Sequence, residues 1–268
     1  MAFLQGELAM NNVNQTLYIP LFGKSFVSKR GIILSDPKAE EIWAEEGFPL
    51  KGKSASKWLA FYMGMRAAVF DRWVAKRLKD TPDAVVLHLG CGMDSRVLRA
   101  GDAECKWYDI DFPAVIAERK KYFQETGSYH MLAADVRELD FLENIHGDKA
   151  IVVMEGICMY LQREELLQLL SKLCSRFSQV SLLMDCYTEF AAKASKYKNP
   201  INDVGVTEVT GLDNPKLLED SSFTFLGEHD MTPPDLIDQL NGMEKTVFRK
   251  LYAGSIAQKM YRLYEYAK

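Results

Sequence analysis

The sequence lacks the marks of a membrane-spanning, secreted or disulfide-stabilised protein. No apolar run approaches the ~18 residues that cross a bilayer, and the first residues lack the basic and apolar segments of a secretion signal. The five cysteines are odd in number, scattered and without a C-x-x-C pair, which argues against a disulfide framework or a metal site. We therefore expect a cytoplasmic protein with reduced, buried thiols and no bound metal.

An excess of positive charge is also absent. The formal net charge is −4 and the pI is about 5.7, which argues against a general nucleic-acid or anionic-membrane binder. With 268 residues, 48% of them hydrophobic and 26% charged, the chain is long enough for one large α/β domain. We expect a small-molecule partner, and the sequence leaves the oligomeric state open.

A glycine turn after a buried strand is the most informative stretch. The apolar run Val85–Leu89 predicts a strand buried on both faces, and Gly90-Cys91-Gly92 and a short helix follow it. Glycines allow φ > 0 and close approach of a ligand, and a helix start offers free N–H groups. A second strand ends in Asp109 and Asp111, about 20 residues later, the spacing at which an acid binds ribose hydroxyls. The pattern predicts a nucleoside site, with either acid on the ribose.

The third glycine of the dinucleotide fingerprint G-x-G-x-x-G is missing. Ser95 stands in its place and Asp94 precedes it. An acid in this turn would repel a pyrophosphate, whereas it suits a cationic or zwitterionic ligand. The turn therefore favours S-adenosylmethionine, which carries a sulfonium and an ammonium, over NAD. A glycine turn without a ligand is disfavoured by the acids that end the second strand.

Two more strands end in acids at the same predicted edge. Tyr129–Ala134 is followed by Asp135, and Lys149–Met154 by Glu155-Gly156. Ligands of open α/β sheets bind at the carboxyl ends of the strands, so the acids of all these strands converge there. Asp135 can reach the adenine amino group, with the backbone of Val136 nearby.

The order of elements predicts one doubly wound, mostly parallel α/β domain. Residues 11–35 are irregular, and their basic side chains, Lys24 among them, fit a solvated arm. The remaining predicted elements are helices at 36–46, 54–79, 114–125 and 164–177 and strands at 180–184, 223–226 and 261–266. We divide the single domain, 1–268, into an N-terminal helical arm (1–80), a cofactor-binding core (81–186), a cap insertion (187–240) and C-terminal elements (241–268).

Arg66 lies close to the apolar stripe of the helix at 54–79, and it has no ideal i,i+4 partner, because Asp71 is five positions on. An arginine near a buried face needs a partner from elsewhere, and a ligand carboxylate is one option. The alternative is an arginine that extends to solvent.

The stretch from Leu17 to Asp185 resembles the class I methyltransferases of the leucine carboxyl methyltransferase and tetracenomycin polyketide O-methyltransferase family. The matching motifs are Ile19-Pro20-Leu21, Ser35-Asp36-Pro37-Lys38-Ala39, Arg66 with Phe70-Asp71, Leu89 to Arg96, Trp107 to Pro113, Asp135, and Glu155 to Tyr160. The resemblance implies a Rossmann-like fold and S-adenosylmethionine as cofactor.

The resemblance also implies roles for particular residues. It puts Gly90 on the methionine part, Asp111 on the ribose, Asp135 and Val136 on the adenine, Glu155 on the ammonium, Arg66 on the carboxylate, Lys24 in the N-terminal arm and Tyr160 in the methyl-transfer cleft. We accordingly predict a cofactor site of Lys24, Arg66, Gly90, Cys91, Gly92, Asp94, Asp109, Asp111, Asp135, Val136, Glu155 and Gly156, with Tyr160 as the catalytic contact.

The predicted function is S-adenosylmethionine-dependent O-methylation of a small molecule, at a carboxylate. Methyl transfer from sulfonium to oxygen is an in-line displacement that mainly requires positioning, so we expect no dedicated general base. The alternatives are an NAD-dependent oxidoreductase and a cofactor-binding module without transferase activity.

Overall fold

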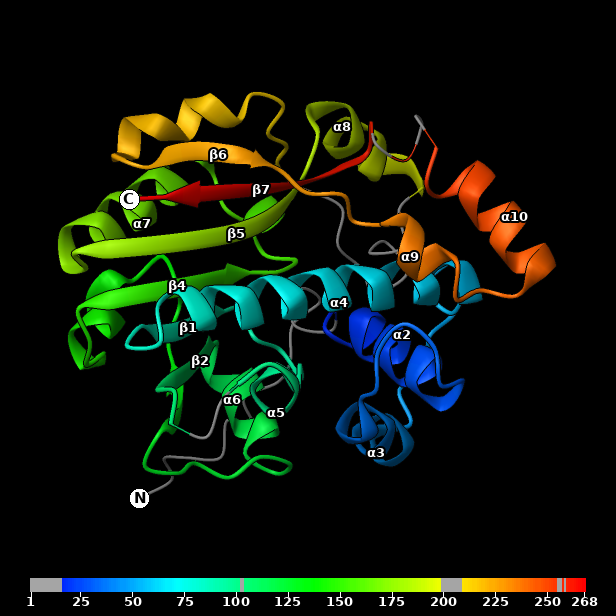
Figure 1. The fold of residues 1–268 in the computed structure, drawn as a ribbon, viewed down its shortest axis with the longest axis horizontal. Coiled ribbons are helices and arrows are strands. Elements are labelled where there is room, and N and C mark those ends of the chain that lie inside the picture. The colour runs from blue at the N-terminus through cyan, green and yellow to red at the C-terminus, as the bar shows by residue number, and fades with distance from the viewer. Residues whose placement is uncertain (1–15, 102–103, 199–208, 255–256, 258) are drawn as a thin grey trace, which may run out of the picture.

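The computed structural model describes residues 16–268 except 102–103, 199–208, 255–256 and 258. Its centre is a seven-stranded sheet in the order β3-β2-β1-β4-β5-β7-β6 (Figure 1). Strands β1 to β5 pair in parallel, and β7 is antiparallel to both of its neighbours. The strands are β1 Val85–Leu89, β2 Trp107–Asp111, β3 Tyr129–Ala133, β4 Lys149–Met154, β5 Gln179–Tyr187, β6 Thr224–Glu228 and β7 Tyr261–Ala267. The predicted α/β fold is confirmed.

Helices cover both faces of the sheet (Figure 1). Val86 of β1 packs in the same cluster as the apolar residues of the long helix α4, whereas Val85 and Leu87 pack with those of α7. This alternation along a strand is what buries both faces of a parallel sheet. The helices are α2 Tyr18–Lys29, α3 Pro37–Glu46, α4 Lys57–Asp80, α5 Arg96–Arg99, α6 Pro113–Arg119, α7 Arg163–Arg176, α8 Glu189–Lys198, α9 Pro234–Ile237 and α10 Gly242–Leu251.

The expected irregular arm is wrong for Tyr18–Lys29, which forms helix α2 and packs along α4. Two glycines allow the helices to approach closely. A Cβ on Gly23 would lie 2.6 Å from Met63 Cβ, and one on Gly64 would lie 2.7 Å from a methyl group of Val27. Contacts this short leave no room for any side chain, so the two glycines fix where α2 crosses α4.

Several boundaries follow from hydrogen bonding at the ends of elements. Asp36 caps α3 as predicted, because its carboxylate accepts from the Ala39 N–H at 2.9 Å. Helix α6 is shorter than predicted, since Tyr122 N–H bonds to the carbonyl of Arg119 in a tighter turn. Strand β5 is longer than predicted, because β7 pairs along its outer edge from Ser181 to Tyr187.

The segment predicted as a cap insertion, 187–240, begins where β5 ends and contains strand β6 of the sheet. Its described residues include helix α8 and the 3₁₀ helix η4, Pro215–Ser221, and they separate β5 from β6 in sequence. Ala191 of α8 lines the large cavity described next. All five cysteines are free thiols and buried, as expected.

Candidate functional site

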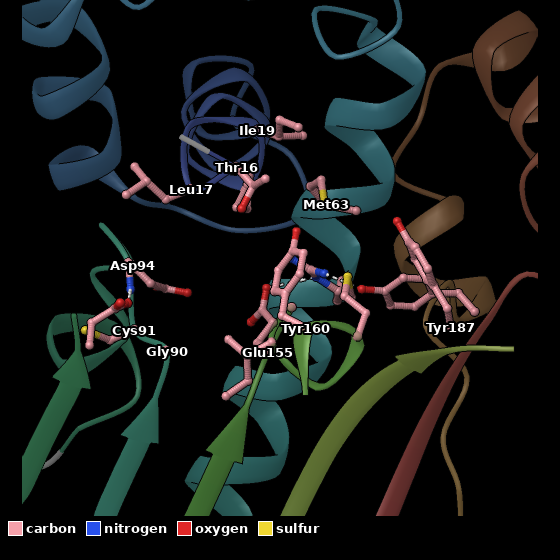
Figure 2. A pocket seen from close by; sticks show the side chains of 18 of the residues that line it. Thr16, Leu17, Ile19, Met63, Gly90, Cys91, Asp94, Glu155, Tyr160 and Tyr187 are labelled. Atoms are coloured by element: carbon pink, nitrogen blue, oxygen red, sulfur yellow. Dashed lines mark hydrogen bonds and ion pairs between the residues drawn. The ribbon is translucent and has the colours of Figure 1, made fainter. Parts of the chain in front are cut away.

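A cavity of about 590 Å³ opens at the carboxyl ends of the parallel strands. Every predicted site residue except Asp109 lines it. Figure 2 shows Gly90, Cys91 and Asp94 on one side of the pocket and Tyr160 and Tyr187 on the other, with Glu155 between them. The structure therefore brings the acids and glycines of separate strands to one place, as parallel topology dictates.

The glycine turn has a shape that other residues would not adopt. Gly90 and Gly92 have φ angles of +67° and +52°, in the left-handed region that favours glycine. A Cβ on Gly90 would lie 2.0 Å from a methyl group of Ile157. The turn therefore exposes bare backbone to the cavity.

Asp111 lies at the cavity, with its carboxylate held by the backbone. One oxygen accepts from the Gly92 N–H and the other from the Phe112 N–H, each at 2.7 Å. Burial raises the pKa of Asp111, and the two N–H donors oppose this shift. The acid thus ties the end of β2 to the glycine turn beside the cavity wall.

Asp109 lies two residues deeper on the same face of β2 and does not line the cavity. It is fully buried, accepts from Trp107 Nε1 at 2.9 Å and from the Tyr129 hydroxyl at 2.7 Å, and pairs with Arg119. Burial alone would raise its pKa, but Arg119, His88 and Tyr129 together outweigh burial and lower the pKa of Asp109 to about 2. The prediction that Asp109 contacts the ligand is not supported, because a strand advances about 6–7 Å over two residues and Arg119 covers it there.

Asp94 sits among three cations rather than alone in the turn. Lys24 Nζ lies 3.0 Å from its carboxylate, Arg99 Nη2 lies 2.9 Å away and Arg96 Nη2 lies 3.4 Å away. Burial disfavours the charge, but Arg96, Lys24 and Arg99 together hold the pKa of Asp94 well below its usual value. Lys24 is buried, so the expectation of a solvated base is wrong for this residue.

Arg66 joins two strand ends across the floor of the cavity. Its Nε lies 2.9 Å from Glu155 Oε1, and its Nη1 donates to Asp185 Oδ2 at 2.8 Å and to the Tyr261 hydroxyl at 3.1 Å. Both Arg66 and Glu155 are buried, so the alternative of a solvent-facing arginine is wrong. The opposite oxygen of Asp185 accepts from the Gly156 N–H at 2.6 Å, which fixes the turn after β4.

Glu155 is held between two arginines, because Arg96 also pairs with it. Burial would raise its pKa, but Arg66 and Arg96 lower the pKa of Glu155 to about 2. At the far end of the cavity, Asp135 accepts from the backbone N–H of Arg137 at 3.0 Å and from its guanidinium at 2.9 Å. Both acids are therefore ionised at neutral pH.

The other end of the cavity is lined by phenols and apolar side chains. We call it the tyrosine half; it comprises Tyr62, Met63, Tyr160, Tyr187, Tyr252 and Tyr261. The rings of Tyr187 and Tyr261 meet edge to face at 4.8 Å. Burial raises the pKa values of Tyr62, Tyr160 and Tyr261, so these phenols keep their protons. We call the part at the carboxyl ends of β1 to β4, lined by the glycine turn, Asp111, Asp135 and Glu155, the cofactor half.

His88 lines the cavity but belongs to the ion network beneath it. Its Nε2 accepts from Arg96 Nη1 at 3.2 Å, and its Nδ1 lies 3.3 Å from Asp109 Oδ1. The imidazole is almost fully buried. Its position as a core residue of β1 agrees with a strand buried on both faces.

Sequence reasoning missed Arg96, Asp185, Tyr187 and Tyr261. Arg96 stands inside the glycine-turn motif, and Asp185 follows the apolar run of β5 just as Glu155 follows β4. The same strand-end rule could have found Asp185. No local pattern marks Tyr187 and Tyr261, because they meet only through the pairing of β5 with β7.

The family model of leucine carboxyl methyltransferases matches residues 9–174. This chain belongs to the leucine carboxyl methyltransferase family. It is 29% identical over 216 residues to the tetracenomycin polyketide synthesis O-methyltransferase TcmP of Streptomyces glaucescens, covering 79% of this chain and 80% of that protein. It is 25% identical to the S-adenosyl-L-methionine-dependent methyltransferase dpfgK of Gibberella zeae, covering 80% of each.

A solved structure agrees in fold. The magnesium protoporphyrin IX methyltransferase ChlM of Synechocystis PCC 6803, with bound SAH, superimposes with a TM-score of 0.52 at 14% identity, covering 87% of this chain and all of that one. Among the described residues no helix is long and apolar enough to cross a bilayer. In the same part of the chain no three metal-ligating side chains gather.

The protein is an S-adenosylmethionine-dependent methyltransferase. The family match favours S-adenosylmethionine over NAD as the cofactor. It also favours an active enzyme over a cofactor-binding module without transferase activity. The lining fits this cofactor in kind, because several carboxylates and a guanidinium surround one cavity, and the cofactor carries both cationic groups and a carboxylate. Gly90 lines the same cavity, and Ile157 packs where a side chain on this residue would stand.

Proposed function

We propose that this enzyme transfers the methyl group of S-adenosylmethionine to a carboxylate oxygen of a small molecule held in the tyrosine half. The observation that carries this proposal is the absence, among the described residues of the tyrosine half, of any side chain that could take a proton at neutral pH. The phenols of Tyr62, Tyr160 and Tyr261 have raised pKa values, so they keep their protons at neutral pH and do not serve as bases. A methyl acceptor that is already ionised can react in the tyrosine half, because it needs no base to remove a proton.

A carboxylate meets this requirement because its reference pKa is about 4, so it is already ionised. The transfer is an in-line displacement that requires the nucleophile about 3 Å from the methyl carbon. The charges of carboxylate and sulfonium cancel as the methyl moves, and a water-poor wall of phenols and apolar groups favours that change. The TcmP relative is named as an O-methyltransferase, which supports oxygen as the acceptor atom.

The proposed roles of the cofactor half follow from its charges. Asp111 would bind the ribose hydroxyls, Glu155 the ammonium and Arg66 the carboxylate, while Asp135 and the Val136 backbone would face the adenine. Lys24, Asp94 and the Gly90-Cys91-Gly92 turn would form the wall beside the methionine part, with Gly156 next to Arg66. Tyr160 would contact the acceptor at the point of transfer. When bound, the cofactor supplies the electrophilic methyl group.

The test is the pH dependence of a single turnover, measured with a carboxylic acid and with the matched alcohol, such as phenylacetic acid and 2-phenylethanol. Carboxylate methylation predicts a transfer rate that is flat from about pH 6 to 9. A rate that rises about tenfold per pH unit, or transfer to the alcohol alone, would indicate base-assisted methylation of a hydroxyl. His88→Asn serves as a check, since a buried histidine in the ion network should change stability and leave the shape of the profile intact.

A further inference from the structure

A second cavity of about 310 Å³ lies next to the tyrosine half. Tyr62, Tyr252, Ala257 and Tyr261 line both cavities, so these side chains form the partition between them. The rest of the second cavity comes from β6, β7, the turn after β6 and the residues after α10, with Glu228, His229, Asp230, Met231, Thr232, Ala253 and Arg262. One side of the partition is therefore apolar and phenolic, and the other is polar with an excess of acids.

Tyr261 is the fixed member of this partition. It is the first residue of β7 and pairs with Tyr187, the last residue of β5. Its hydroxyl accepts from Arg66 Nη1 at 3.1 Å, and Arg66 is buried and paired with two carboxylates. Its ring meets Tyr187 at 4.8 Å and Tyr62 at 6.4 Å, both edge to face. A ring held at its tip and along both edges cannot turn aside without breaking several contacts.

Tyr62 is held less firmly. Its hydroxyl points to Met231 Sδ at 3.4 Å, and a thioether is a weak acceptor. The guanidinium bond of Tyr261 is charge-assisted and stronger. Of these two rings in the partition, Tyr261 is therefore the more firmly anchored.

We propose that Tyr261 determines acceptor specificity, because its anchored ring closes the tyrosine half against the second cavity and sets the length of the group that fits there. The proposal rests on the proposed function only in taking the tyrosine half as the acceptor side. Without this ring, the acceptor space would reach the second cavity, where Arg262 pairs with Glu228 at 2.7 Å and Asp230 has no ion-pair partner among the described residues. Asp230 favours a cationic or hydrogen-bond-donating end. The wild-type wall instead selects compact acceptors with an apolar end.

The probe is a series of S-adenosylhomocysteine analogues with nitrogen in place of sulfur, each carrying an alkyl arm where the transferred methyl would be. The adenosine and amino-acid parts anchor each compound in the cofactor half, so binding does not depend on which atom the enzyme methylates. Arms of increasing length end in either a methyl or an ammonium group. Calorimetry gives each dissociation constant relative to the compound without an arm.

In the wild type we expect each added methylene to improve affinity about fourfold, until the arm meets Tyr261 and affinity falls. Tyr261→Ala should remove this fall, and ammonium-ended arms that pass the partition should gain about fivefold over methyl-ended ones, the size of one partly exposed ion pair. Tyr261→Phe keeps the ring and loses only the hydroxyl that bonds to Arg66. Because Arg66 lines the cofactor half, this variant should bind the compound without an arm more weakly than the wild type does. Its length limit should stay closer to the wild-type limit than that of Tyr261→Ala.

Tyr264→Phe is the matched control, because Tyr264 lies on the opposite face of β7, outside both cavities, and donates to a backbone carbonyl at 3.3 Å. It should retain the wild-type length profile. Tyr261→Leu replaces Tyr261→Ala if the alanine variant does not fold. The proposal is overturned if the wild type shows no length limit, or if a folded Tyr261→Ala or Tyr261→Leu keeps the wild-type limit. The turnover assay with acids and alcohols separately decides the proposed function.

Discussion

Lys24 Nζ and Asp94 Oδ2 lie 3.0 Å apart with side-chain exposures of 3% and 6%, and this ion pair fastens helix α2 to the glycine turn. The two partners are not equally dependent on each other. Asp94 also pairs with Arg96 and Arg99, whereas Asp94 is the one ion-pair partner of Lys24 within the described ranges. Removing one charge should therefore have a different cost from removing the other.

We expect Asp94→Asn to lower the free energy of unfolding by about 3–5 kcal/mol, because it leaves the buried Lys24 without a carboxylate, whereas Arg96 and Arg99 keep other acids. Lys24→Met should cost about 1–2 kcal/mol, since its apolar chain still packs and Asp94 keeps two arginines. Urea unfolding measures both values. Lys29→Met, an exposed lysine at the end of the same helix, is the control and should be nearly neutral. Equal losses for Lys24→Met and Asp94→Asn would contradict this account.

Substitutions at Asp111 and Asp109 should have different effects, the first on cofactor binding and the second on the stability of the fold. Asp111→Ala is expected to weaken S-adenosylmethionine binding by about 1–3 kcal/mol, the cost of a lost hydrogen bond to a charged acceptor. Asp109→Asn should instead lower stability by about 3 kcal/mol, because it leaves the buried Arg119 without its carboxylate. Titration calorimetry and urea unfolding on both variants check the pair. An unchanged dissociation constant in Asp111→Ala would move the ribose contact elsewhere.

Arg66→Lys should not behave as a conservative change. A lysine keeps the charge but cannot reach Glu155, Asp185 and Tyr261 together with one ammonium. We expect cofactor affinity to fall about tenfold or more, since a charge-assisted bond is worth about 1.5–3 kcal/mol. Arg72→Lys is the control on the same helix, because Arg72 makes a half-exposed pair with Asp235. If Arg66→Lys bound S-adenosylmethionine with wild-type affinity, Arg66 would not hold the cofactor carboxylate through two guanidinium N–H groups.

Glu265 of β7 should contribute acid sensitivity away from the cavity. Burial opposes its charge, but hydrogen bonds from His229, Trp73 and Arg77 lower the pKa of Glu265 to about 2, against 4.5 for the free side chain. The folded state binds the proton less readily than the unfolded chain. The stabilisation is therefore complete above about pH 5 and is lost as the pH falls toward 2.

The measurement is urea unfolding at several pH values from 5 down to 3, on the wild type and on Glu265→Gln. The variant should start less stable and lose less stability over this range. Protonation of Asp109 and Glu155 lowers the free energy of unfolding equally in both proteins. The difference between the two curves therefore gives the contribution of Glu265. Parallel curves would show that Glu265 does not hold its low pKa in solution.

The sheet could be predicted because its signals are local. A strand buried on both faces appears as a continuous apolar run such as Val85–Leu89, and the residue that ends it stands at the ligand edge of a parallel sheet. Gly90, Asp111, Asp135 and Glu155 were found in this way. Resemblance to a family then supplied Lys24 and Tyr160, which no strand-end rule marks.

What could not be predicted depends on contacts between distant parts of the chain. Helix α2 has no side-chain cap at Leu17, and it packs because Gly23 meets α4 while Gly64 meets Val27. The partner of Arg66 in β5 is 119 residues away. A single sequence does not show which glycine faces which helix or which acid faces which arginine, because these pairings exist only after the sheet has formed.

The place of β7 between β5 and β6 also sets the order in which the cavity can be completed during synthesis. β5 and β6 both leave the ribosome before β7, and in the sheet they do not pair with each other, because β7 lies between them. The strands that carry the glycine turn, Asp111 and Glu155 are made and can pair more than a hundred residues before Tyr261 emerges. A growing chain can therefore shape the pocket for the methyl donor while Tyr252 and Tyr261 of the tyrosine half are still missing, and β7 then completes that half.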